Sequence, residues 1–159
     1  MGWPMTPDGR AEVTRMTTAP AAAVWGALAD GWMYSSWVVG TSRVRAVDLT
    51  WPQVGSRIHH SVGVWPAVID DESVVLESDP GRLLVIQAKG WPMGEARVEI
   101  TLAEAIGGGC LITIMEDATK GPGVLVPRAL RQQVIAARNV EALRRLALVA
   151  TGRHREAAS

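Results

Sequence analysis

Residues 126–152 read VPRALRQQVIAARNVEALRRLALVATG, a stretch in which apolar residues recur at intervals of three and four. This spacing is typical of one face of an α-helix, and it predicts a single amphipathic helix of about 25 residues. Pro127 suits the first turn, and Gly152 is expected to end the helix before a frayed tail at 153–159. The residues of the predicted apolar face are Leu130, Val134, Ile135, Asn139, Ala142, Leu143, Leu146 and Val149.

Upstream of this segment the sequence alternates polar and apolar residues, as strands that bury one face do. The expected strands lie within 11–20, 42–49, 56–65, 67–79, 82–90, 95–105 and 110–119, and two short helical pieces lie within 19–31 and 32–37. An apolar sheet face must be covered, and only the predicted long helix can cover it. The sequence therefore predicts an α+β fold, in which a curved antiparallel sheet of about seven strands wraps around a long C-terminal helix. The two short helices fall between strands 1 and 2.

The length of 159 residues indicates one domain, spanning 1–159 with its core at about 10–150. Hydrophobic residues make up 48% and charged residues 20% of the chain, which is typical of globular proteins. A single cysteine, Cys110, excludes an internal disulfide and a zinc site made of cysteines. Because there is no apparent leader and no apolar run long enough to cross a bilayer, we expect a cytoplasmic protein without integral membrane contact.

The charge distribution does not indicate nucleic acid as a partner, and the sequence motifs do not indicate a cofactor. Basic and acidic residues are equal in number, sixteen each, although the arginines concentrate in the predicted C-terminal helix. Such arginines usually form the solvated face of a helix, and they are not interleaved with aromatic residues as in many nucleic-acid-binding segments. The chain also lacks a glycine-rich phosphate loop and a nucleophile elbow, so no cofactor is expected. The sequence is compatible with either a monomer or a homodimer.

Three stretches resemble a known family: APAAAVWGALAD (19–30), WPQVGSRIHHSVGVWP (51–66) and EDATKGPGVLVP with RNVEALRRL (116–127 and 138–146). The chain resembles the START-like, or SRPBCC, superfamily with its helix-grip fold, and within it the polyketide cyclase/dehydrase and lipid-transport group. The resemblance implies a hydrophobic small molecule, such as a polyketide or lipid, bound between the sheet and the long helix. It does not choose between carrying and transforming that molecule, and a regulatory module that reads a ligand or protein partner is a third alternative.

Strand alternation selects the ionisable groups that would enter such a cavity. In segment 57–64, His60 lies on the face with the apolar residues and His59 on the opposite face. In segment 110–119, Glu116 shares its face with Ile112 and Ile114. His60 and Glu116 are therefore the candidate catalytic pair, acting as acid and base in a polyketide cyclase or dehydratase. The alternative is that the two side chains only satisfy each other near a wet rim.

The ligand-binding candidates are mostly aromatic, in a chain that has seven Trp, one Tyr and no Phe. Flat aromatic walls suit ring-shaped or polyene ligands, although tryptophans also fill cores. Asn139, an amide on the apolar helix face, would either orient a ligand or bond a backbone carbonyl. No metal site is expected, because adjacent strand residues such as His59 and His60 cannot readily chelate one ion. The ligand-binding candidates are Tyr34, Trp37, Trp65, Trp91 and Asn139.

Overall fold

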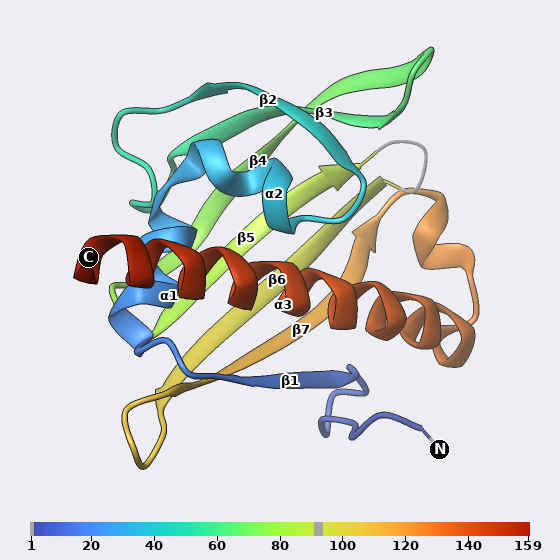
Figure 1. Ribbon diagram of the computed structural model, residues 1–159. Helices are drawn as coiled ribbons and strands as arrows, with labels where there is room; N and C mark the ends of the chain where they lie inside the picture. Colours follow the sequence, from blue (N-terminus) through green and yellow to red (C-terminus); the bar gives the residue numbers. More distant parts are fainter. Residues whose placement is uncertain (1, 91–93) are drawn as a thin grey trace.

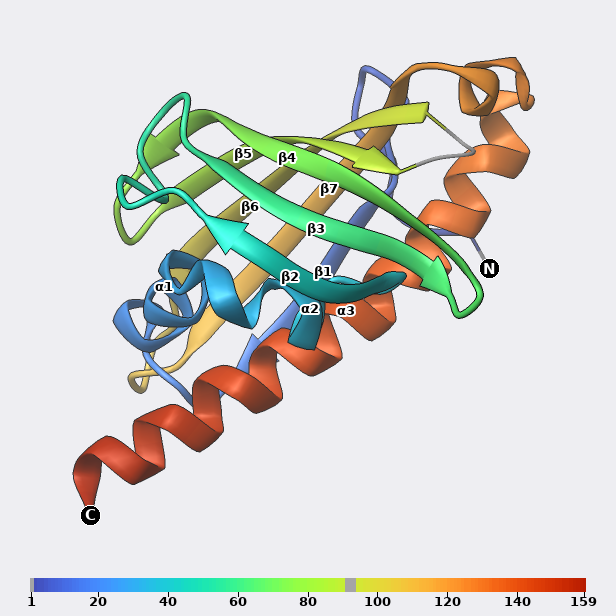
Figure 2. The ribbon, with the colours of Figure 1, turned by 90° about the horizontal axis from the view of Figure 1, so that it is seen from above.

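The computed structural model describes residues 2–90 and 94–159. Its strands form one antiparallel sheet in the order β1-β7-β6-β5-β4-β3-β2, so that consecutive strands are neighbours from β2 to β7 and β1 closes the other edge beside β7. The sheet curls over the long C-terminal helix, as Figures 1 and 2 show from two directions. The strands are β1 (Glu12–Thr17), β2 (Thr41–Val47), β3 (Arg57–Val64), β4 (Ala67–Asp79), β5 (Leu83–Gly90), β6 (Gly94–Glu104) and β7 (Cys110–Lys120).

The helices lie on the concave side of the sheet (Figure 1). Helix α3 crosses this face and contacts β1, β7, α1 and α2. None of the helices in the described ranges is both long and apolar enough to span a membrane. The predicted helix-grip fold, including the two short helices between the first two strands, is confirmed. The helical elements are α1 (Ala21–Ala29), η1 (Gly31–Met33), α2 (Tyr34–Trp37), η2 (Pro122–Leu125) and α3 (Arg128–Ala158).

Helix α3 is longer than the sequence predicts. It has 31 residues and continues through Gly152 to Ala158, so the expected end at Gly152 and the frayed tail are wrong. A glycine inside a helix costs about 1 kcal/mol relative to alanine, and a glycine that ends a helix typically has a positive φ. Gly152 keeps a negative φ. The turn of α3 that follows Gly152 is also held against the end of α1, because Arg153 Nη1 donates to Asp30 Oδ2 at 2.9 Å.

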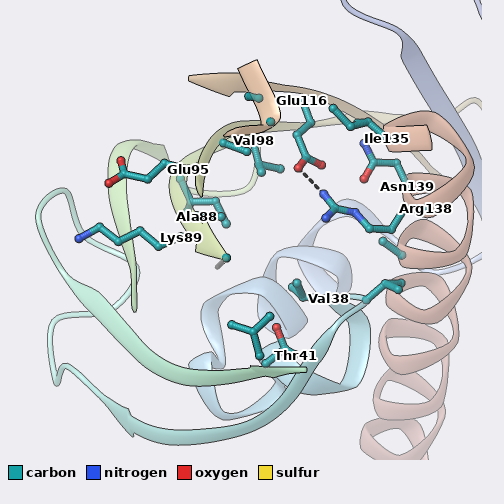
Figure 3. Close-up of a pocket in the computed structure, with 18 of the residues that line it drawn as sticks. Val38, Thr41, Ala88, Lys89, Glu95, Val98, Glu116, Ile135, Arg138 and Asn139 are labelled. Carbon is teal, nitrogen blue, oxygen red and sulfur yellow. Dashed lines mark hydrogen bonds and ion pairs between the residues drawn. The ribbon is translucent and has the colours of Figure 1, made fainter. Parts of the chain in front are cut away.

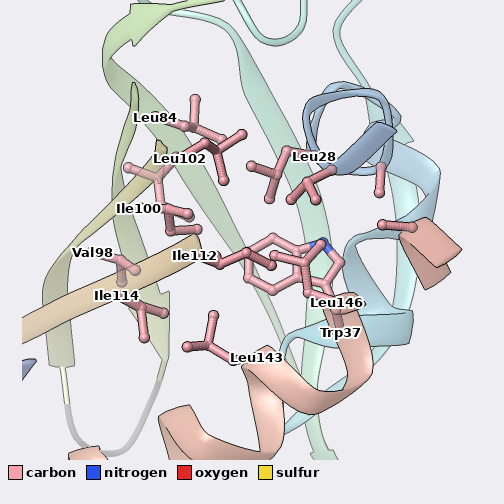
Figure 4. Packing of buried hydrophobic residues seen from close by; sticks show 14 of the residues in the cluster. Leu28, Trp37, Leu84, Val98, Ile100, Leu102, Ile112, Ile114, Leu143 and Leu146 are labelled. Atoms are coloured by element: carbon pink, nitrogen blue, oxygen red, sulfur yellow. The ribbon is translucent and has the colours of Figure 1, made fainter. Parts of the chain in front are cut away.

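The core is built by the C-terminal half of α3. Leu143 and Leu146 are buried against the sheet and α1, together with residues such as Ile100 and Ile112 (Figure 4). The apolar side chains in the N-terminal half of α3 are more exposed than predicted. Leu130 and Val134, expected in the core, are 59% and 64% exposed because this part of α3 borders a cavity, to which both side chains contribute.

Replacing Leu146 by alanine tests this division of α3. Leu146 is fully buried, so Leu146→Ala is expected to lower the free energy of unfolding by about 2–5 kcal/mol through lost burial and a residual void. The control is Leu148→Ala on the same helix, where the side chain is 59% exposed and the change is expected to stay below about 0.5 kcal/mol. Urea unfolding measures both, and equal losses would contradict the packing described here.

Candidate functional site

A cavity of about 410 Å³ lies between the concave face of the sheet, α2 and the N-terminal half of α3. Its walls come mostly from apolar side chains on β3, β5, β6, β7 and α3, with a few polar groups among them (Figure 3). Pockets of this size and character are typical of small-molecule sites. Representative apolar wall residues are Val62, Ile86, Val98, Ile114 and Ile135.

Strand alternation delivers both candidate catalytic groups to the inner face, as predicted. His60 on β3 is 2% exposed and Glu116 on β7 is 3% exposed, and both line the cavity. His59 lies on the outer face, where its ring nitrogens are 3.9 Å from carboxylates of Asp48 and Glu72. The inward placement of His60 and Glu116 is therefore confirmed.

Glu116 pairs with a different residue from the one expected. Arg138 Nη2 on α3 donates to Glu116 Oε1, and the charge of Glu116 raises the pKa of the guanidinium (Figure 3). No hydrogen bond joins Glu116 to His60 within 2–90 and 94–159, so the expectation that the two satisfy each other is wrong. The physical reason is that a permanently charged guanidinium is a better counter-ion than an imidazole in a buried site.

His60 belongs to a separate polar chain. Its Nε2 is 3.0 Å from Ser73 Oγ, which is in turn 2.9 Å from the hydroxyl of Tyr34. The rings of His60 and Tyr34 stack with centroids 5.3 Å apart. Burial lowers the pKa of His60, and burial raises the pKa of Tyr34 to about 12. Both side chains are therefore uncharged at neutral pH, and His60 Nδ1 has no hydrogen-bond partner among the described residues.

Three of the five predicted ligand-binding residues line the cavity. Tyr34 and Trp37 are buried and meet edge to face at 5.6 Å, which gives one wall an aromatic surface. Asn139 is 2% exposed and also faces the cavity. Its Nδ2 has no partner in the described part of the chain, so this amide group does not bond the backbone carbonyl that was the alternative.

Of the two remaining ligand-binding candidates, Trp65 does not line the cavity. Trp65 lies in the turn between β3 and β4, which projects beyond the rest of the sheet in Figure 1, and it is 85% exposed. The expectation that Trp65 rims the cavity is wrong, because the long β3–β4 hairpin carries its turn away from the cavity wall. Trp91 falls outside the described residues.

Arg138 is the functional candidate that sequence reasoning missed. All arginines of the predicted helix were assigned to its solvated face, yet Arg138 reaches the cavity. Its side chain keeps 44% of its surface accessible because it borders open cavity space. A signal was present, since Arg138 is three residues after Ile135 and four before Ala142, the spacing of residues on one helix face.

The described residues hold no cluster of three or more His, Cys, Asp or Glu side chains suited to a metal ion. What the cavity offers instead is an apolar volume with two polar groupings, Arg138–Glu116 and Tyr34–Ser73–His60. Such a volume can hold an apolar molecule while the polar groups orient it.

Comparison with known proteins agrees with this geometry. Residues 8–151 match the family described as polyketide cyclase / dehydrase and lipid transport, whereas no curated protein matches. Among solved structures, a protein from Nitrosomonas europaea shares 16% identity and a TM-score of 0.68, over 94% of this chain and 99% of that one. The Zhui aromatase/cyclase from Streptomyces sp. R1128 shares 19% identity and a TM-score of 0.64, over 93% and 96%. The di-domain ARO/CYC StfQ of the steffimycin biosynthetic pathway shares 15% identity and a TM-score of 0.68, over 91% and 51%.

Stability as a function of pH tests the environment of His60. Since the pKa of His60 is lowered in the folded protein, the unfolded chain takes up this proton first as the pH falls. The wild type is therefore expected to lose more stability than His60→Gln between about pH 7.5 and pH 5, so the stability gap between them narrows or reverses.

Urea unfolding across this pH range gives the comparison. His154→Gln, at the exposed end of α3, is the control for losing a solvent-facing imidazole. Parallel pH profiles for the wild type and His60→Gln would contradict a lowered pKa for this buried ring.

Proposed function

Because the chain belongs to the polyketide cyclase/dehydrase and lipid-transport family, we propose that it binds a hydrophobic small molecule, such as a polyketide or a lipid, between the sheet and α3. The observation that carries the proposal is the cavity itself, with its volume of about 410 Å³ and its mainly apolar walls. Removing apolar ligand surface from water stabilises the complex by roughly 25 cal/mol per Å², which is the main driving force expected here.

The polar groups of the cavity would orient the ligand and not supply most of the affinity. Tyr34 and Trp37 offer aromatic surface against which a ring or an unsaturated chain packs. Arg138 offers hydrogen-bond donors on the α3 side, where Asn139 also lines the cavity. A ligand with an apolar body and one polar region matches this distribution.

Filling the cavity tests the binding proposal. Ala142 lies on α3, is 5% exposed and faces the cavity, so Ala142→Trp places a large side chain in the ligand volume. Nile red, an uncharged apolar fluorophore, is expected to bind the wild type with a blue-shifted, enhanced emission, and Ala142→Trp is expected to weaken this binding at least about tenfold.

Val140→Trp is the matched control, because Val140 is two positions away on the same helix, is 38% exposed and does not line the cavity. It is expected to bind Nile red like the wild type. Circular dichroism checks that both variants fold. A wild type that does not bind the dye, or equal binding by Ala142→Trp, would count against the cavity as the binding site.

A second candidate is a polyketide cyclase or dehydratase, favoured by the uncharged His60 on the cavity wall. In this reading the cavity wall shifts enough to expose the unpartnered Nδ1 of His60, which accepts a proton from the carbon next to a substrate carbonyl. The C–H electron pair forms a C=C bond while the carbonyl π pair moves to oxygen, and Arg138 stabilises the resulting enolate. Glu116, already paired with Arg138, would position the guanidinium and would not act as the acid. Two of the similar structures are described as aromatase/cyclases, which supports testing this candidate.

The enzymatic candidate predicts a large effect of His60. With a synthetic poly-β-ketone thioester as substrate, His60→Ala is expected to lower kcat by about 10²–10⁴-fold, the usual contribution of a general base. Glu116→Gln is expected to lower kcat as well, because Arg138 loses its anchor. His59→Ala on the outer face is the control and should retain turnover. Unaltered turnover in both His60→Ala and Glu116→Gln would contradict the catalytic roles assigned to these residues. Ligand binding would then be the function that is still supported.

A further inference from the structure

The charges that border the cavity are balanced within the protein. Five charged side chains line it, from β5, β6, β7 and α3, and each has an oppositely charged neighbour in the described part of the chain. The cavity therefore has no free charge to neutralise a charged ligand. The pairs are Lys89 with Glu72 at 3.0 Å, Glu95 with Lys120 at 3.7 Å, Arg131 with Asp117 at 2.6 Å, and Arg138 with Glu116.

Hydrogen-bond donors are in excess on the α3 side. A guanidinium has five N–H donors, and within the described part of the chain the Arg138 side chain makes one hydrogen bond, from Nη2 to Glu116. The adjacent Asn139 has an Nδ2 group that is buried and has no partner within 2–90 and 94–159. Both side chains extend from α3 toward the cavity space (Figure 3), while Lys89 and Glu95 lie on the far side. The Asn139 Nδ2 group has almost no accessible surface to offer a ligand. The Arg138 side chain is 44% accessible, so its free guanidinium donors are suited to a ligand oxygen that accepts.

We propose that the ligand is uncharged and presents a hydrogen-bond-accepting oxygen, such as a ketone or ester carbonyl, to Arg138. This rests on the proposed binding function and narrows its ligand class. The apolar part of the ligand then lies against walls such as Val98 and Ile114.

The two other ligand classes fit less well. A free carboxylate would bring a second negative charge next to the buried Glu116, and Arg138 would have to be shared between two anions. A pure hydrocarbon would leave the free Arg138 donors without an acceptor. The ion pair thus selects against acids, and the free guanidinium donors select for a ligand oxygen.

Dodecanoic acid and its methyl ester test the selection against charge, since they share the chain and differ in charge. At about pH 8, where the acid is ionised, calorimetric titration below the micellar concentration is expected to show the ester binding the wild type at least tenfold tighter. Glu116→Gln removes the internal counter-ion and frees Arg138 for a ligand carboxylate. In that variant we expect the affinity for the acid to rise at least about tenfold, with the ester changed less than about threefold.

Glu95→Gln, on the far side of the cavity, is the matched control and is expected to keep the wild-type selectivity. Arg138→Lys keeps the positive charge beside Glu116 and loses the fork of guanidinium donors, so it is expected to lower the affinity for the ester about tenfold. It tests the oxygen contact even if Glu116→Gln does not fold. Equal or tighter binding of the acid by the wild type, or unchanged acid binding by a folded Glu116→Gln, would overturn the proposal. If neither compound binds the wild type, the proposed binding function fails together with it.

Discussion

The way α3 covers the concave face of the sheet is the constraint on which the rest of the structure depends. Its C-terminal half packs Leu143 and Leu146 into the core, whereas its N-terminal half borders the cavity with Ile135 and Arg138. The same helix therefore closes the core at one end and forms a cavity wall at the other. The Arg138–Glu116 ion pair links α3 to β7 beside the cavity, where apolar side chains of the helix and the sheet do not pack against each other.

Much of this arrangement could be predicted from the sequence, because it follows from the periodicity of apolar residues in strands and in helices. The period of two in the strands placed His60 and Glu116 on the inner face, and the period of three to four placed Asn139 toward the cavity. These patterns report which face of an element is buried. They work where one face is mostly apolar, as in β7, where Ile112 and Ile114 share the buried face with Glu116, and in the C-terminal half of α3.

The patterns could not predict which polar groups meet, since that depends on contacts between elements far apart in the chain. Arg138 reaches Glu116 across 22 positions of sequence, and composition alone assigned it to solvent. Trp65 was expected at the cavity because of its residue type, but the length of the β3–β4 hairpin carries it outward. Gly152 was expected to end α3, yet the helix backbone continues through it and Arg153 contacts Asp30.

The central claim is that an apolar ligand lies inside the cavity and not on the exposed apolar surface. Intermolecular nuclear Overhauser effects between methyl-labelled protein and bound methyl dodecanoate measure this most directly. The account predicts contacts from the ligand chain to the methyl groups of Val98, Ile114 and Ala142, all of which line the cavity. Contacts confined to the exposed methyl groups of Val64 and Leu125 would contradict it.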